Sequence, residues 1–90
     1  MELEKKINAL FQELNFEKVS VSGNPLFLLN GLYYRITLVK GLKSYVIECA
    51  DSYDKAVKNI FEDCDLYPIS LNETELIDDL RHDLLKYYMN

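Results

Sequence analysis

Two alternating segments on either side of a short turn constrain the fold of this chain most. Residues 32–39 and 44–50 place β-branched, aromatic and aliphatic side chains at every second position. This period of two predicts strands that each have one buried face. Between them lies the turn 40–43, in which Gly41 would supply the positive φ of a tight turn. The sequence therefore predicts an antiparallel hairpin.

A turn centred on Gly41 fixes the register of this hairpin. Ile36 then lies opposite Ile47, and Arg35 lies opposite Glu48. The apolar faces of both strands coincide in this register, which supports it independently of the turn. We expect Ile47 to lie in the core. The charged pair would lie on a solvent-exposed face, where it contributes only ~0.2–1 kcal/mol. The same register pairs Leu38 with Tyr45 and Tyr34 with Cys49.

A helix is expected after the second strand. Asp51 and Ser52 are good N-cap residues, and Asp54 adds negative charge to the first turn. An apolar stripe at helical spacing would lie on the hairpin; it consists of Ala56, Val57, Ile60 and Phe61. The acidic residues 62–65 would then follow the C-terminal end of this helix, where the helix dipole disfavours carboxylates.

The flanking segments supply the remaining elements. Residues 2–14 and 73–88 carry apolar side chains at helical spacing, the latter after a capping box at 70–73, and residues 16–21 resemble a short strand. The run 26–29 is either a strand, as the Asn30-Gly31 turn suggests, or a loop over the sheet edge. The prediction is one α+β domain over residues 1–90. Its small antiparallel sheet of three to four strands has one N-terminal and two C-terminal helices, in the order α-β-β-(β)-β-α-α.

Hydropathy and cysteine content limit the location of the protein. No run approaches the ~20 apolar residues of a membrane helix, and the acidic, amphipathic start is unlike a signal peptide. Two cysteines without a repeated spacing do not form a disulfide framework. We therefore expect Cys49 and Cys64 to be free thiols in a reducing cytoplasm.

Charge is distributed unevenly along the chain, whose net charge is −5. Residues 1–47 carry six basic and four acidic side chains, whereas residues 48–83 carry eleven acidic and three basic ones. Direct nucleic-acid binding needs lysines and arginines that neutralise phosphates. The acidic half therefore disfavours direct binding to nucleic acid and favours a basic protein partner.

The chain contains no recognisable catalytic or cofactor motif. His82 is the only histidine, and no serine or cysteine on a strained turn accompanies it, so we expect an exposed surface residue. The cysteines lack the paired spacing of zinc ligands. Oxygen ligands for Ca²⁺ or Mg²⁺ exist at Glu62, Asp63, Asp65 and Glu73 or Glu75. The calcium-loop pattern and its glycine are absent there. We expect no enzymatic activity, no cofactor and no metal site.

Carboxylates make up the predicted binding site. The carboxylates within residues 62–65 would lie at the C-terminal end of a helix, which disfavours negative charge. We therefore expect these carboxylates to serve a role other than stability. The acidic side of the last helix would extend the same surface. The predicted partner-binding residues are Glu62, Asp63, Asp65, Glu75, Asp78, Asp79 and Asp83. The tyrosines are expected at the edge of the core, with their hydroxyls in water.

In element order, length and acidity, the whole chain resembles small inhibitor proteins carried by mobile genetic elements. One such group is the acidic, DNA-mimicking anti-CRISPR proteins that block RNA-guided nucleases; another is the immunity proteins that neutralise bacterial toxins. No sequence motif is shared, so the resemblance assigns no site residue.

The resemblance implies a cytoplasmic bacterial or phage protein that inhibits a basic or nucleic-acid-binding partner, such as a nuclease or toxin. Independently of the resemblance, we expect no cofactor, no direct contact with nucleic acid or membrane, and a monomer or weak homodimer. The alternative function is a self-associating structural or regulatory module that pairs through residues 26–29 and an open sheet edge.

Overall fold

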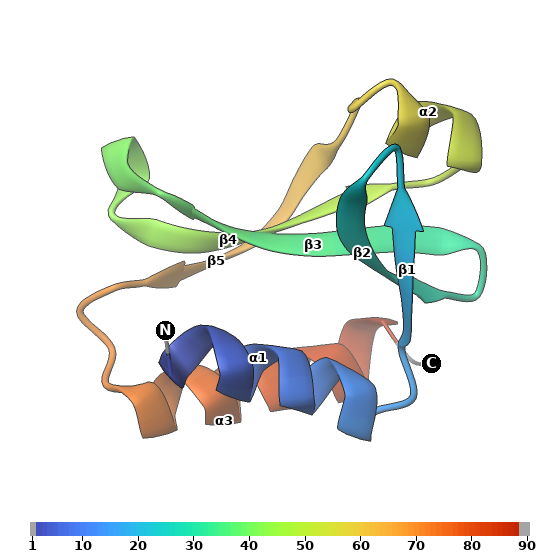
Figure 1. The fold of residues 1–90 in the computed structure, drawn as a ribbon. Helices are drawn as coiled ribbons and strands as arrows, with labels where there is room; N and C mark the ends of the chain where they lie inside the picture. Colours follow the sequence, from blue (N-terminus) through green and yellow to red (C-terminus); the bar gives the residue numbers. More distant parts are fainter. Residues whose placement is uncertain (1, 89–90) are drawn as a thin grey trace.

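The structure is a computed structural model that describes residues 2–88 (Figure 1). Its elements are α1 (Glu2–Glu13), β1 (Glu17–Val21), β2 (Asn24–Leu29), β3 (Leu32–Val39), a 3₁₀ turn η1 (Lys40–Leu42), β4 (Ser44–Ala50), α2 (Tyr53–Val57), β5 (Glu62–Pro68), α3 (Glu73–Asp83) and a π-helical turn η2 (Leu84–Tyr88). The predicted α+β class is confirmed. The sheet has five antiparallel strands in the order β1-β2-β3-β4-β5, so the prediction missed the strand that follows α2.

Two-residue turns with positive φ connect the first three strands. Ser22 and Gly23 have φ of 52° and 80°, and Asn30 and Gly31 have φ of 53° and 80°. These values suit the primed turns whose twist matches that of antiparallel strands. The run 26–29 is therefore part of a strand. This strand pairs with β1 through residues 24–28 and with β3 through residues 27–29.

The turn between β3 and β4 differs from the prediction in its backbone. It is a 3₁₀ turn, and the residue with positive φ is Lys43 (48°) rather than Gly41. The predicted register is nevertheless confirmed: Ile36 lies opposite Ile47, and Arg35 lies opposite Glu48. The apolar pattern of the strands therefore determines the pairing more strongly than the type of turn does.

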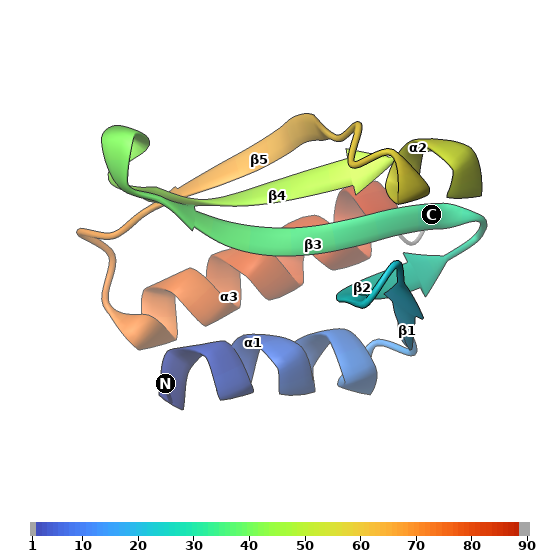
Figure 2. The ribbon, with the colours of Figure 1, turned by 45° about the horizontal axis from the view of Figure 1, so that its top comes forward.

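Helices α1 and α3 lie side by side beneath one face of the sheet, here called the inner face (Figures 1 and 2). Ion pairs from Lys6 to Glu73 and from Arg81 to Glu13 connect the two helices at their surface. Between helices and sheet lies the main core, in which the Phe11 ring stacks on a ring from β2. Its buried members are Ile7, Leu10, Phe11, Leu14, Phe16, Phe27, Tyr34, Tyr45, Ile47, Tyr67, Leu76, Leu80 and Leu84.

The short helix α2 packs against the opposite, outer face of the sheet. It begins at Ser52, whose Oγ accepts a hydrogen bond from the Lys55 backbone N–H. It ends at Val57, shortly before Asn59 adopts a φ of 60°. The predicted stripe is therefore only partly right, because Val57 and Ile60 are 41% and 52% exposed. A small second core remains on this face, formed by Val21, Leu26, Ala50 and Ala56 with Val19, Tyr33 and Phe61.

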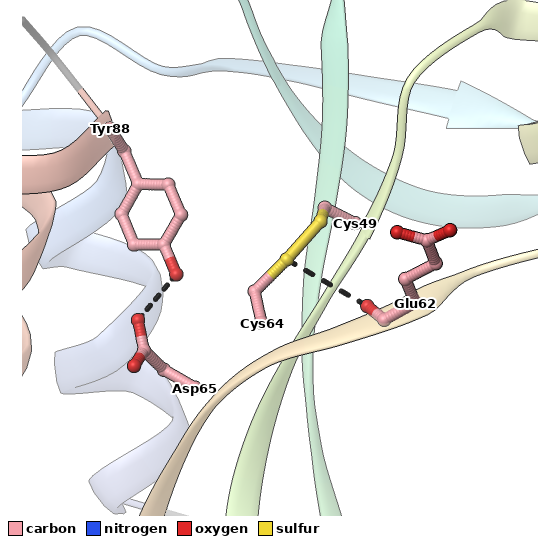
Figure 3. The surroundings of a disulfide bond; sticks show 5 residues. All are labelled: Cys49, Glu62, Cys64, Asp65 and Tyr88. Carbon is pink, nitrogen blue, oxygen red and sulfur yellow. Dashed lines mark hydrogen bonds between the residues drawn. A yellow bond between two sulfur atoms is a disulfide. The ribbon is translucent and has the colours of Figure 1, made fainter.

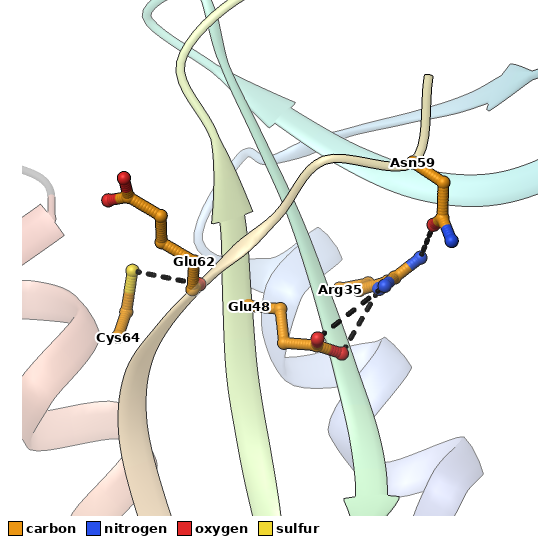
Figure 4. A network of polar contacts seen from close by, with 5 residues as sticks. All are labelled: Arg35, Glu48, Asn59, Glu62 and Cys64. Atoms are coloured by element: carbon orange, nitrogen blue, oxygen red, sulfur yellow. Dashed lines mark hydrogen bonds and ion pairs between the residues drawn. The ribbon is translucent and has the colours of Figure 1, made fainter. Parts of the chain in front are cut away.

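The connection after α2 covers the charged pair that was expected to be exposed (Figure 4). The Arg35 guanidinium donates from Nε to Glu48 at 3.1 Å and from Nη1 to the Asn59 side-chain oxygen at 2.7 Å. It also lies 3.9 Å from the centre of the Phe61 ring. The side chains of Arg35 and Glu48 are only 27% and 17% exposed. The charged pair is thus partly buried and belongs to a network.

Two single substitutions compare the faces of β4. Ile47→Ala should lower the free energy of unfolding by about 2–5 kcal/mol, because it removes fully buried side-chain atoms from the core. Glu48→Gln should lower it by about 1–2 kcal/mol, because it weakens a charged hydrogen bond in a partly buried network. Urea unfolding of both variants tests this order. A larger loss for Glu48→Gln would contradict the observed assignment of faces.

Candidate functional site

The predicted carboxylates at residues 62–65 lie on a strand and do not follow a helix. They belong to β5, which pairs only with β4 and forms one edge of the sheet. Their predicted position at a helix end, against the helix dipole, is therefore wrong, since α2 ends at Val57. They line a sheet edge instead, where charged side chains commonly protect exposed backbone groups from strand pairing.

A β-bulge shapes this edge at Cys64. Ile47 of β4 lies opposite Asp65, whereas the next residue, Glu48, lies opposite Asp63. Cys64 is therefore one extra residue on β5. Such a bulge locally interrupts the alternation of side chains. It brings Cys64 toward the inner face, on the same side as Cys49.

The two cysteines form a disulfide between β4 and β5 (Figure 3). The Cα atoms of Cys49 and Cys64 are 6.5 Å apart, and Cys64 Sγ lies 3.8 Å from the backbone carbonyl oxygen of Glu62. The prediction of free thiols is wrong. It failed because the pairing depends on β5, whose first residues were predicted to follow the end of a helix.

Two tyrosine–aspartate pairs cross between β5 and the C-terminal helical segment. The Tyr67 hydroxyl, on β5, donates to the Asp83 carboxylate on α3 at 2.7 Å. In the reverse direction, the Tyr88 hydroxyl of η2 donates to Asp65 on β5 (Figure 3). The expectation of solvated tyrosine hydroxyls is therefore wrong at both positions. These pairs use two of the predicted binding carboxylates to hold β5 against α3.

Burial and these hydrogen bonds keep both phenols protonated. Burial raises the pKa of the Tyr67 hydroxyl, and the hydrogen bond to Asp83 raises it further. The pKa of Tyr88 is raised in the same way, first by burial and then by its hydrogen bond to Asp65. A phenol that stays neutral remains a hydrogen-bond donor, so both pairs persist throughout the neutral pH range.

Helix α3 adds a row of carboxylates on the side that carries Asp83, whose carboxylate contacts β5. Glu75 and Asp79 lie two turns and one turn before Asp83, at the i, i+4, i+8 spacing of one helix side. Glu75 also completes a cap at Asn72: its backbone N–H donates to Asn72 Oδ1, and its carboxylate accepts from Asn72 Nδ2. The capping box therefore begins at Asn72, two residues later than predicted.

These groups define an acidic edge, composed of Glu62, Asp63 and Asp65 on β5 and Glu75, Asp79 and Asp83 on α3. Asp78 does not belong to it, because it lines a hollow between α1 and α3 beside Lys6. Asp63 lies on the outer face next to Glu48, whereas Glu62 lies opposite Cys49. The exposed carboxylates of the acidic edge are therefore Glu62, Asp63, Glu75 and Asp79, of which Glu75 also accepts a hydrogen bond from Asn72.

Within residues 2–88, no group of three or more His, Cys, Asp or Glu side chains is arranged to hold a metal ion. None of the helices in this range is long and apolar enough to cross a membrane. Comparisons of the chain with protein-family models, with curated proteins and with solved structures found no match.

The buried phenols predict a loss of stability at alkaline pH. Tyr67 is 3% exposed and has a raised pKa, so it stays neutral in the folded state after the unfolded state ionises near pH ~10. The contribution of this neutral phenol to the free energy of unfolding is therefore complete below pH ~10. Above that pH the free energy of unfolding falls by about 1.4 kcal/mol per pH unit. Urea unfolding between about pH 9 and 11.5 measures this slope.

Two tyrosine variants control this measurement. Tyr67→Phe should make the pH slope less steep by about 1.4 kcal/mol per pH unit, while the raised pKa of Tyr88 keeps part of it. Tyr53→Phe, which changes an exposed ring on α2, should leave the slope as in the unmodified protein. An identical slope in the unmodified protein and Tyr67→Phe would contradict the assignment.

The disulfide predicts a stability that depends on reductant. Residues 49 and 64 are 15 apart in sequence, and closing such a loop contributes about 3 kcal/mol on the chain-entropy model. A phosphine reductant should lower the free energy of unfolding by about this amount. The double variant Cys49→Ser, Cys64→Ser should not respond to the reductant. Alkylation of two thiols in the denatured, unreduced protein would show that the bond is absent.

Proposed function

We propose that this protein is a non-enzymatic inhibitor that binds a basic protein through the acidic edge. The observation that carries the proposal is the placement of four exposed carboxylates, Glu62, Asp63, Glu75 and Asp79, on two adjoining elements. A surface of one charge attracts a partner of opposite charge and raises the rate of encounter.

The crossed tyrosine pairs support this proposal by giving the edge a fixed shape. Because Tyr67 binds Asp83 and Tyr88 binds Asp65, the strand and the helix that carry the exposed carboxylates are held together. A preorganised surface loses less conformational entropy when it binds. The partner classes proposed are nucleases and toxins, whose nucleic-acid grooves or basic active sites a carboxylate surface would fill.

The cytoplasmic location expected from the sequence is part of this proposal. The Cys49–Cys64 disulfide favours an oxidising compartment over that location, since disulfides rarely persist in a reducing cytoplasm. Alkylation of thiols in intact cells, followed by a count of modified cysteines, would decide whether the bond exists there. An unmodified pair would place the protein in an oxidising compartment instead.

The self-association alternative loses one of its two supports, the run 26–29. Within this run, which was to pair with a second copy, residues 26–28 already pair with β1 and residues 27–29 with β3. Leu26 and Phe27 are buried. No observation now favours this function over binding through the acidic edge.

A charge-reversal variant tests the proposal by pull-down from host lysate. Changing Glu62, Asp63, Glu75 and Asp79 to Lys should abolish capture of the partner, while Asp65 and Asp83 stay intact to preserve the fold. The matched control reverses four carboxylates outside the acidic edge: Glu4, Glu17, Asp54 and Asp78. An equal loss of partner capture in both variants would mean that the attraction is non-specific. Unchanged capture by the variant of the acidic edge would refute the proposed site.

A further inference from the structure

Strand β2 pairs with only the first part of β3. Their pairing covers residues 27–29 and 32–34, whereas β3 pairs with β4 from residue 33 to residue 39. Residues 35–39 of β3, here called the open segment, therefore have a strand on one side only. In Figure 2 this part of β3 runs along the front of the sheet with no strand before it.

The open segment presents backbone groups without a strand partner. The two-residue turn at Asn30-Gly31 makes Leu29 and Leu32 a hydrogen-bonded pair. Along β3, every second residue counted from Leu32 therefore directs its backbone N–H and C=O groups to the side of β2, and the residues between them direct theirs to β4. Ile36 and Leu38 therefore direct their N–H and C=O groups to the side from which β2 is missing. Among residues 2–88, no other backbone group pairs with them there. Such an edge binds added strands.

A cavity lies where β2 and β3 diverge. It has a volume of about 160 Å³, similar to cavities that hold a benzene ring. Leu26, Phe27 and Ile36 give it apolar walls, while Asn8 of α1, Lys18 of β1 and Arg35 of β3 contribute its polar groups. A strand that extended the sheet here would pass this cavity and could place one apolar side chain in it.

Helix α1 restricts what can occupy the open segment. It lies beneath the place where the missing strand would run, as its Asn8 lines the cavity there (Figure 2). Pairing two copies edge to edge about a two-fold axis would bring both α1 helices under the same seam. A single extended segment that carries no helix layer of its own avoids this overlap.

The charges beside the open segment determine the chemistry of its partner. Lys18 lies at the cavity, and Lys40 directly follows the open segment. Neither makes an ion pair with another residue in the range 2–88. We propose that β3 binds an extended, acidic segment of another protein as an added strand. One apolar side chain of this segment fills the cavity, and carboxylates at its two ends face Lys18 and Lys40.

A synthetic peptide tests this proposal on the full chain. The probe is a capped, fluorescent Asp-Thr-Ile-Thr-Val-Thr-Asp peptide; the matched probe has Lys in place of both Asp. In the free protein, the amide protons of Ile36 and Leu38 should exchange rapidly. Saturation with the acidic peptide should slow both at least about tenfold, whereas Thr37, paired with β4, stays protected throughout.

Charge-reversal variants complete the test. Lys18→Glu combined with Lys40→Glu should weaken binding of the acidic peptide about tenfold. Lys58→Glu, which follows α2 on the outer face and belongs neither to the cavity lining nor to the open segment, should leave it unchanged. The proposal is overturned if the acidic peptide does not bind, if the Lys peptide binds equally well, or if binding leaves the amides of Ile36 and Leu38 unprotected. The proposal is also overturned if, without any peptide, the Ile36 and Leu38 amides become protected from exchange as the protein concentration rises. That result would mean that a second copy of the chain occupies the open segment.

Discussion

The pairing of β3 with β4 in one register supports most of the remaining structure. It directs Ile47 toward α1 and α3, and it directs Glu48 toward Arg35 on the outer face. Val46 and Ile47 are both fully buried, so β4 has protein on both faces. A shift by one residue would turn Glu48 into the helix-covered core, where an unpaired charge costs several kcal/mol. The same register places Cys49 within reach of β5.

The parts of the fold that local patterns encode could be predicted from the sequence. The β3–β4 register followed from alternation on two strands, and the β2–β3 turn from Asn30-Gly31. Helix α1 followed from its apolar spacing and its end near Asn15, which has a φ of 68°. In each case the chain segment and its tertiary environment favour the same conformation, so a short window of residues is sufficient.

Strand β5 could not be predicted, because its conformation depends on distant residues. Its first four residues are acidic or cysteine and have low strand propensity. It is a strand because β4 offers an edge, because Cys49 bonds Cys64, and because Tyr67 reaches Asp83. The carboxylates predicted at residues 62–65 lie on this strand, so the reason given for them was wrong, and their role in binding stays a prediction. The use of Asp65 and Asp83 inside the protein carried no sequence signal.

The sequential strand order has a consequence for how the chain folds. Every strand pairs with the strand before or after it in sequence, so the sheet can grow by closing short loops. The contact between α1 and α3 is different, since Lys6 and Glu73 are 67 residues apart. We expect the meander to form early and the two helices to dock late. The two ends of the chain would then assemble together, on a sheet that already exists to receive them.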